Sequence, residues 1–177
     1  DLRHHIVTME NYVKAGNIEE LKKYLDEIGE RYQLAETLTY CSNTTVNGIL
    51  SYFSQEASRY NIDYKVNLGI PEDVKIAKTD LSILFGNLLE NALEACQRQR
   101  SGERKIHVRG QTAQNTFALA IDNTYETEPQ RDKMGKFRSM KHAGTGIGTE
   151  SVRDIVSRYD GVIEFETKGD LFCVSVL

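Results

Sequence analysis

The sequence predicts an α+β protein, in which an antiparallel helical hairpin precedes a two-layer α/β sandwich with a mixed, largely antiparallel sheet. Three observations lead to this prediction. Apolar residues recur every three or four positions through residues 2–35, with the narrow spacing of coiled-coil seams. Broader helical faces follow at about 45–60, at 80–98 and after residue 148. Five short segments with alternating apolar and polar residues lie between and after these helices, as expected for strands.

Composition limits the class of protein. The 177 residues suffice for one ordinary domain and a small appendage. With 40% hydrophobic residues, 27% charged residues and two prolines, we expect a soluble, globular chain. A net charge of -4 does not indicate a nucleic-acid partner. The three scattered cysteines match no metal-site spacing and predict reduced thiols in the cytosol. No apolar run reaches the roughly 18 residues of a membrane span. Because the first residue is Asp, we expect a fragment of a longer protein.

Residues 1–40 predict two helices joined by a short turn at Ala15-Gly16-Asn17. A turn this short makes the helices antiparallel. Two such narrow seams bury little surface alone, so we expect a second hairpin to complete a four-helix bundle in a homodimer. The expected seam residues are Leu2, Ile6, Met9 and Val13 in the first helix and Ile18, Leu21, Leu25, Ile28, Tyr32 and Ala35 in the second.

The remaining residues, 41–177, predict the sandwich. A helix at about 45–60 precedes a strand at 62–69, and a second helix runs from Asp80 to Arg98. Strands are then expected at 105–112 and 115–123, joined as a hairpin across residues 113–115. The chain closes with strands at 162–167 and 171–176, joined across Lys168-Gly169-Asp170.

The helix from Asp80 to Arg98 has an unusual polar face. At about 100° per residue, Asn87, Glu90, Asn91 and Glu94 share the side opposite its apolar residues. No Lys or Arg lies between Lys78 and Arg98 to pair these carboxylates. Amide and carboxylate oxygens suit Mg²⁺, which takes only one or two protein ligands beside substrate phosphates. An ordinary solvated helix face is the alternative.

The segment from about Thr124 to Gly148 has no helical or strand periodicity. A segment this long inside a compact domain indicates a functional lid or a linker. It carries cations that suit phosphate oxygens, namely Lys133, Lys136, Arg138 and Lys141. GTGIG then runs into a helix, whose N-terminus offers N–H groups to an anion.

NLLENALEA, in the helix from Asp80 to Arg98, resembles the N-box of the GHKL nucleotide-binding superfamily, which includes histidine kinases, Hsp90, gyrase-type ATPases and mismatch-repair ATPases. The resemblance implies ATP and Mg²⁺ as cofactors, with Asn91 as the metal ligand, Glu90 as the acid/base residue and Asn87 beside the phosphates. FRSMK with HAGTGIG resembles the lid of the pheromone-receptor branch. It implies phosphate contacts from Ser139 and Lys141. We expect the backbone of Gly144, Gly146 and Gly148 to approach the phosphates as well, because glycine permits a close approach before a helix N-terminus.

DLRHH, near the start of the chain, resembles the phosphoacceptor box of sensor histidine kinases that receive peptide pheromones. The resemblance implies His4 as the phosphoacceptor. Members of that branch often carry an acidic residue next as a general base, and here that position holds His5. An imidazole also accepts a proton near neutral pH, so His5 is a candidate base.

The order of elements is similar throughout to the cytoplasmic core of a quorum-sensing histidine kinase of the pheromone-receptor type. The resemblance implies a dimerisation and phosphotransfer hairpin at 1–40 and a Bergerat-fold ATPase domain at 41–177, with its lid at about 124–148. It also implies autophosphorylation by ATP, transfer to an aspartate of a response regulator, and a cytoplasmic location, with membrane attachment only through missing upstream segments. A serine kinase of the anti-sigma-factor type and a non-kinase phosphorelay scaffold remain alternatives. The stimulus, the regulator and the choice between transfer within and between protomers are left open.

Two adjacent residues compete to bind adenine, which the superfamily recognises with an Asp at the end of a strand. Strand alternation places Asn123 on the inward face with Ile121, whereas Asp122 points outward. A bulge at the strand end would reverse this assignment. We favour Asn123, whose amide offers both an acceptor and a donor. Two nearby departures from the family pattern are Tyr125 in place of a glycine and Thr149 in place of a leucine.

Overall fold

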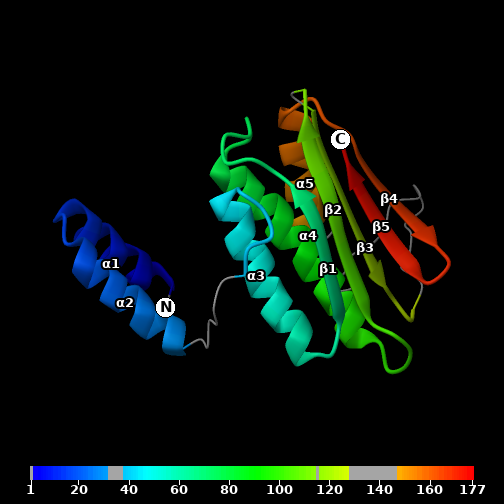
Figure 1. The fold of residues 1–177 in the computed structure, drawn as a ribbon, viewed down its shortest axis with the longest axis horizontal. Coiled ribbons are helices and arrows are strands. Elements are labelled where there is room, and N and C mark those ends of the chain that lie inside the picture. Colours follow the sequence, from blue (N-terminus) through cyan, green and yellow to red (C-terminus); the bar gives the residue numbers. More distant parts are fainter. Residues whose placement is uncertain (1, 32–37, 115, 128–146) are drawn as a thin grey trace. The chain divides into compact units, whose positions relative to one another are not determined.

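The computed structural model describes residues 2–31, 38–114, 116–127 and 147–177 (Figure 1). The chain forms two compact units, Asp1–Glu36 and Thr37–Leu177. Unit 1 holds the helices α1 (Leu2–Lys14) and α2 (Ile18–Arg31). The helices of unit 2 are α3 (Thr44–Arg59), α4 (Lys78–Arg98) and α5 (Ile147–Arg158). Its strands are β1 (Asp63–Gly69), β2 (Lys105–Ala113), β3 (Thr116–Thr124), β4 (Ile163–Lys168) and β5 (Leu171–Val176).

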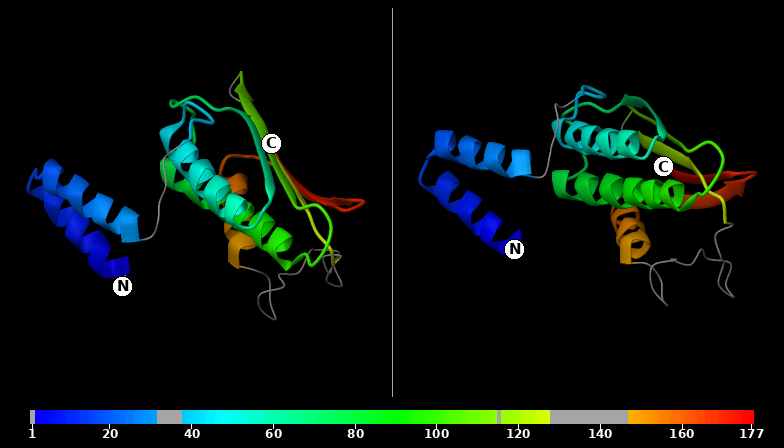
Figure 2. Two further views of the ribbon diagram at one scale, coloured as in Figure 1. Left: turned by 60° about the horizontal axis from the view of Figure 1, so that its bottom comes forward. Right: turned by 90° about the horizontal axis from the view of Figure 1, so that it is seen from below.

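The sheet of unit 2 has the strand order β1-β2-β3-β5-β4. β1 and β2 are parallel, and the other three pairs are antiparallel. A parallel pair needs a long crossover, which α4 supplies between β1 and β2. Figure 2 shows that the three helices cover one face of this sheet and leave the other open. The prediction of an α+β fold with a mixed, largely antiparallel sheet is therefore confirmed.

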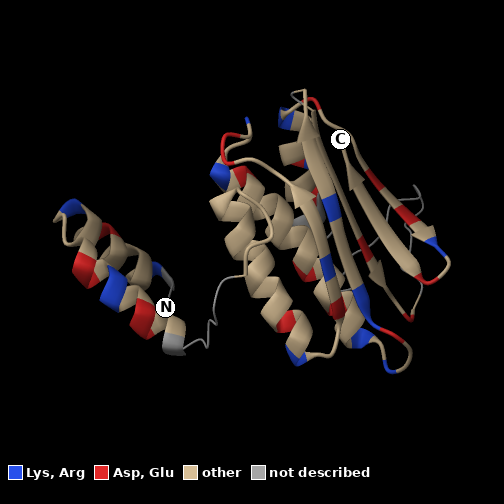
Figure 3. Ribbon diagram, viewed as in Figure 1, with Lys and Arg blue, Asp and Glu red and all other residues tan. Residues whose placement is uncertain are grey.

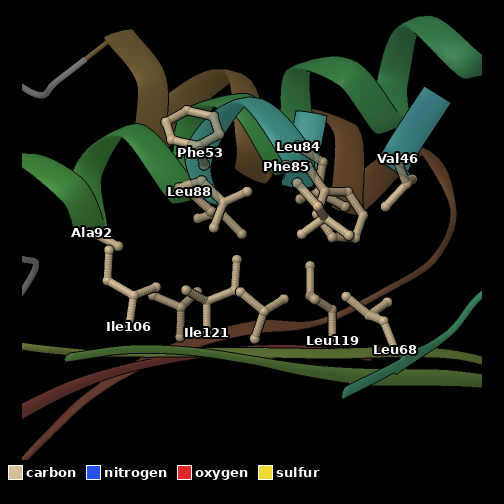
Figure 4. Close-up of a cluster of buried hydrophobic side chains, with 14 of the residues drawn as sticks. Val46, Phe53, Leu68, Leu84, Phe85, Leu88, Ala92, Ile106, Leu119 and Ile121 are labelled. Atoms are coloured by element: carbon tan, nitrogen blue, oxygen red, sulfur yellow. The ribbon is translucent and has the colours of Figure 1, made fainter. Parts of the chain in front are cut away.

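The core of unit 2 lies between the helices and the inner face of the sheet. Figure 4 shows Phe85 and Leu88 pointing from α4 toward Ile121 and Leu119 of β3. These side chains are buried because the apolar face of α4 packs directly on the inward-facing apolar residues of β3, and water is excluded between them. Asn43 caps the N-terminus of α3, accepting a hydrogen bond from the amide of Val46 at 3.0 Å.

The open face of the sheet is charged. Its two edge strands carry outward-facing charged residues, which Figure 3 shows as red and blue bands. These residues are Asp63 and Lys65 on β1 and Glu164, Glu166 and Lys168 on β4, and all five are exposed.

One buried carboxylate joins the start of α4 to the end of α5. Asp80 is 6% exposed and accepts hydrogen bonds from Arg158 at 3.0 Å and from the hydroxyl of Tyr159 at 2.8 Å. The same hydroxyl accepts from the amide of Ala77 at 3.0 Å. Because a buried carboxylate needs such partners, these contacts fix the C-terminal end of α5 against α4.

Unit 1 is an antiparallel pair of helices, with Gly16 in the turn at a φ of 70°. Its seam differs from the predicted one. Three apolar seam residues are half-buried, namely Met9, Leu21 and Ile28, together with His5, Tyr12 and Tyr24. Four others are 44–57% exposed, namely Ile6, Val13, Ile18 and Leu25. The rings of His5 and Tyr12 on α1 both pack against the ring of Tyr24 on α2, and part of the predicted seam faces outward. Residues 32–35 of that seam lie outside the described residues.

Within the described ranges, no helix combines the length and the apolarity that crossing a membrane requires.

Candidate functional site

The polar face of α4 is the first wall of the candidate site. Glu90 and Asn91 are exposed, and Asn87 and Glu94 are half-buried. Glu94 forms an ion pair with Arg98, one turn further on, at 3.7 Å. The expectation of a polar face without a cation is therefore wrong for Glu94, because residues four apart on a helix are neighbours. The exposed pair at positions 90 and 91 is the part of this face that suits a ligand.

The end of β3 is the second wall. Asn123 is 3% exposed and continues the inward series of Leu119 and Ile121. Asp122 lies on the opposite face, where it forms an ion pair with Arg109 of β2. The register of β2 and β3 is continuous from Ile106 to Ala113, so no bulge rotates Asp122 inward. The predicted orientations of Asp122 and Asn123 are thus those of the structure, whereas the adenine contact stays a prediction.

The two walls lie against each other. Figure 4 shows Ala92 of α4 beside Ile106 of β2, and Ile106 pairs directly with Asn123. Further along, the hydroxyl of Thr124 donates to Oε1 of Gln99 at 2.8 Å and accepts from the amide of Lys105 at 3.0 Å. The strand end is therefore fixed to the C-terminal end of α4. Sequence patterns did not indicate this contact, because nothing local pairs Thr124 with Gln99.

Two residues that follow β3, Tyr125 and Glu126, form side-chain hydrogen bonds with other parts of unit 2. Tyr125, which replaces the family glycine, donates its hydroxyl to the carbonyl of Gly169 at 2.9 Å. The ring is therefore directed toward the β4–β5 turn. The carboxylate of Glu126 accepts from the amide of Arg100 at 2.6 Å and from Ser101 at 3.1 Å, and these bonds lower the pKa of Glu126.

α5 supplies the third described part of the site. The helix begins at Ile147, so Gly148 lies in its first turn. Its backbone N–H groups are those that an anion would meet at a helix N-terminus. Four other predicted phosphate-binding residues lie outside the described residues, namely Ser139, Lys141, Gly144 and Gly146. Their roles stay predictions.

The exposed side chains of α4 fit a Mg²⁺ ion that receives most of its ligands from bound phosphates. Among the described residues, no group of three or more His, Cys, Asp or Glu side chains forms a metal site by itself. The exposed side-chain amide of Asn91 offers one oxygen, which is the small protein share that Mg²⁺ takes when phosphates and waters supply the rest.

Unit 1 carries the two predicted histidines. His4 is exposed, whereas His5 is half-buried and its Nδ1 lies 2.8 Å from the hydroxyl of Tyr24. The contact from α1 to Tyr24 of α2 was not predicted, because the sequence seam omitted both residues.

Two surface hollows among the described residues lie apart from these walls. One is lined by the 100–105 loop with Asn61 and Asp63, and the other lies on the open face of the sheet between Arg109 and Glu164. None of Asn87, Glu90, Asn91 and Asn123 lines either hollow. We place the candidate site by its donors, because most of the lid predicted at about 124–148 lies outside the described residues. The ends of that segment differ from the prediction, since Thr124 is the last residue of β3 and α5 begins at Ile147.

A protein-family model described as "GHKL domain" matches residues 76–177. The "Probable C4-dicarboxylate sensor kinase" of Bacillus subtilis is 31% identical over 94 residues, which cover 50% of this chain and 17% of that protein. The chain thus spans a small part of that relative.

Two solved structures share the fold. The Acinetobacter baumannii histidine kinase AdeS has a TM-score of 0.56 at 16% identity, over 99% of this chain and 94% of that one. The histidine kinase ThkA, in complex with the response regulator protein TrrA, has a TM-score of 0.52 at 18% identity, over 93% of this chain and 49% of that one.

Proposed function

Because the chain belongs to the family of GHKL domains, we propose that it is the phosphotransfer and ATP-binding core of a two-component histidine kinase. The observation that carries this proposal is the arrangement in unit 2. Glu90 and Asn91 are exposed on α4, which packs over β2 and β3. Near the end of β3, Asn123 faces inward toward the helix layer. The chain's similarity to a sensor kinase and to histidine kinases supports the same activity.

In the proposed site, Asn91 would hold Mg²⁺ and Asn87 would lie beside the phosphates. The metal would neutralise phosphate charge as ATP reacts. Nδ2 of Asn123 donates to the carbonyl of Thr124 at 3.0 Å, which leaves its Oδ1 to accept from the adenine amino group. Asp122 is the competing adenine ligand, and its ion pair with Arg109 on the outer face argues against it.

The phosphates meet the glycine-rich side of the site. We assign contacts with the phosphates to Ser139, Lys141 and the backbone of Gly144, Gly146 and Gly148, on the strength of the resemblance to the lid motif. These groups would stabilise the charge on the γ-phosphate. As in phosphoryl transfer generally, positioning and charge neutralisation supply most of the rate.

His4 of unit 1 is the proposed acceptor because it is the exposed imidazole of the RHH motif. A ring nitrogen attacks the γ-phosphorus, a nitrogen–phosphorus bond forms, and the bond to the leaving ADP oxygen breaks. The proton on the other ring nitrogen is then released. Glu90 is the acid/base residue that the N-box resemblance implies. The phosphoryl group passes next to an aspartate of a response regulator, the kind of protein that ThkA binds.

Finer features belong to the same proposal. The outward-facing apolar residues of unit 1, 44–57% exposed, support a homodimer through the hairpin. The RHH and FRSMK motifs support the peptide-pheromone, quorum-sensing type of receptor. The match to a sensor kinase supports a cytoplasmic core whose membrane attachment comes from upstream segments.

One experiment tests the activity. The chain is incubated with Mg²⁺ and labelled ATP, and the product is then treated with acid. We expect acid-labile phosphate in the wild type and none in His4→Gln, with equal ATP binding by calorimetry. Acid-stable phosphate would indicate a serine kinase, and ATP binding without incorporation would indicate that His4 is not an acceptor.

A further inference from the structure

The contact between His5 and Tyr24 joins the two helices of unit 1 near the proposed acceptor. Nδ1 of His5 and the Tyr24 hydroxyl are 2.8 Å apart, and the ring centroids are 6.0 Å apart. The ring of Tyr12 packs against Tyr24 at 5.8 Å between centroids. Both His5 and Tyr24 are half-buried. A polar pair at a helix–helix contact fixes the relative rotation of the helices, because its hydrogen bond forms in one geometry.

Chemistry decides which group donates. A phenol, with an ordinary pKa of about 10, is a stronger hydrogen-bond donor than a neutral imidazole N–H, and the imidazole lone pair is the stronger acceptor. We therefore take Tyr24 as the donor and Nδ1 of His5 as the acceptor. In a neutral imidazole the second nitrogen, Nε2, then carries the hydrogen. The basic lone pair of His5 is occupied, so the ring is poorly placed to take a proton from a neighbour.

The same contact orients His4. Successive residues on a helix diverge by about 100°, and neighbours in sequence do not face each other. With His5 turned toward α2, His4 is turned away from it and is exposed. The hydroxyl of Thr8 donates to the backbone carbonyl of His4 at 2.9 Å and leaves the His4 ring available.

We propose that Tyr24 is a positioning residue, which holds His5 through Nδ1 and so presents His4 to ATP, and that His5 is not the proton acceptor. This inference rests on the proposed kinase activity. It gives His5 a different role from the general base that the family pattern implied.

The hydrogen-bond direction has a direct signature. The chain has four histidines, so ¹⁵N-labelled histidine gives a sparse NMR spectrum, in which His5→Asn identifies the His5 signals. At about pH 8.5, where an ordinary imidazole is neutral, we expect the Nε2–H tautomer for His5. Tyr24→Phe should shift the Nδ1 resonance toward that of a free imidazole, and Tyr12→Phe, which removes a hydroxyl from the same cluster, should not. A predominant Nδ1–H tautomer in the wild type would overturn the assignment.

Kinetics test the consequence. Because the Oδ1 of asparagine lies near the position of Nδ1 and is not a base, His5→Asn should keep autophosphorylation within about fivefold of wild type, whereas loss of a general base costs about 10²–10⁴-fold. Tyr24→Phe should lower the rate severalfold with the KM for ATP unchanged, and Tyr12→Phe should leave both unchanged. A hundredfold loss in His5→Asn would contradict the proposal. If the wild type takes up no phosphate, the kinase proposal fails, and the NMR result still decides the His5–Tyr24 contact.

Discussion

The helices of both units have apolar residues every three or four positions, on a narrow seam in unit 1 and on a broader face in unit 2. Much of the seam remains exposed, whereas the broader face is buried. The apolar face of α4 is buried, with Leu81, Phe85 and Leu89 at 0% exposure. On α1 and α2, Ile6, Val13 and Leu25 remain 44–57% exposed. The difference is the presence of a sheet, which covers α4 with a second layer. Periodicity therefore predicts which face of a helix seeks burial, but not what buries it.

The largest expected effect tests this contrast. Leu89→Ala should destabilise unit 2 by about 2–5 kcal/mol, because it leaves a cavity in a fully packed core. Leu25→Ala is the matched control and should cost about 1 kcal/mol or less in an isolated hairpin, since the side chain is 45% exposed. Urea titrations followed by residue-resolved NMR separate the two units.

A cost for Leu25→Ala that approaches that of Leu89→Ala would remove the contrast. If that cost also rises with protein concentration, a second copy buries Leu25, as the proposed homodimer requires.

Asn91→Ala should have the next largest effect and should be confined to unit 2. Loss of the amide oxygen leaves phosphate charge poorly compensated, so Mg²⁺-dependent ATP affinity should fall by about tenfold or more, equivalent to about 1.4 kcal/mol. Calorimetry with and without Mg²⁺ measures the change. Because Asn91 is exposed, the urea unfolding midpoint of the variant should equal that of the wild type. An unchanged Mg²⁺-dependent affinity would rule out the metal assignment.

Adenine recognition is the subject of a finer comparison within β3. Asn123→Ala should reduce ATP affinity severalfold, whereas Asp122→Ala should affect it little, because Asp122 points to the opposite face. Asn123→Ala also removes the bond to Thr124, at a cost of about 1–3 kcal/mol in stability, so affinities are compared well below the unfolding temperature. A larger loss of affinity from Asp122→Ala refutes the register argument.

The smallest effect concerns the thiols, all of which lie in unit 2. Burial and the hydrogen bond to Asp122 raise the pKa of Cys173 to about 11. Folding therefore favours the neutral thiol. This contribution to stability is full below the ordinary thiol pKa of about 8.5 and is lost as the pH rises through about 11.

Iodoacetamide measures this effect, because it reacts with the thiolate. At pH 8 the folded chain should be alkylated at Cys173 more slowly than the urea-unfolded chain, and the folded rate should keep rising to about pH 11. Equal rates in the two states at pH 8 would show that the pKa is not raised.

Local patterns predicted most elements of unit 2. The helix expected at about 45–60 is Thr44–Arg59, and the strand expected at 171–176 is Leu171–Val176. The orientations of Asp122 and Asn123 also followed, since alternation is a local property of a strand. Strand order did not follow, because the pairing of β5 with β3 joins segments that carry no mutual signal in a single sequence.

Two features of the polar regions were missed for different reasons. The ion pair of Glu94 with Arg98 has the i,i+4 spacing, so the sequence contained the signal. The contact of His5 with Tyr24 required the rotation of α1 about its axis, which depends on how large rings pack between two helices. Periodicity alone does not determine that rotation to better than one residue.

The charged edge strands of the sheet affect how copies of the chain can associate. An edge strand has unpaired backbone groups that invite another strand, and charged side chains on it oppose such pairing. β1 carries Asp63 and Lys65, and β4 carries Glu164, Glu166 and Lys168, all exposed. These charges disfavour extension of the sheet from one molecule to the next. Assembly through strand addition is thereby disfavoured. The proposed homodimer would then join through the hairpin and not through the sheet edges, and a closed pair of this kind forms no open-ended polymer.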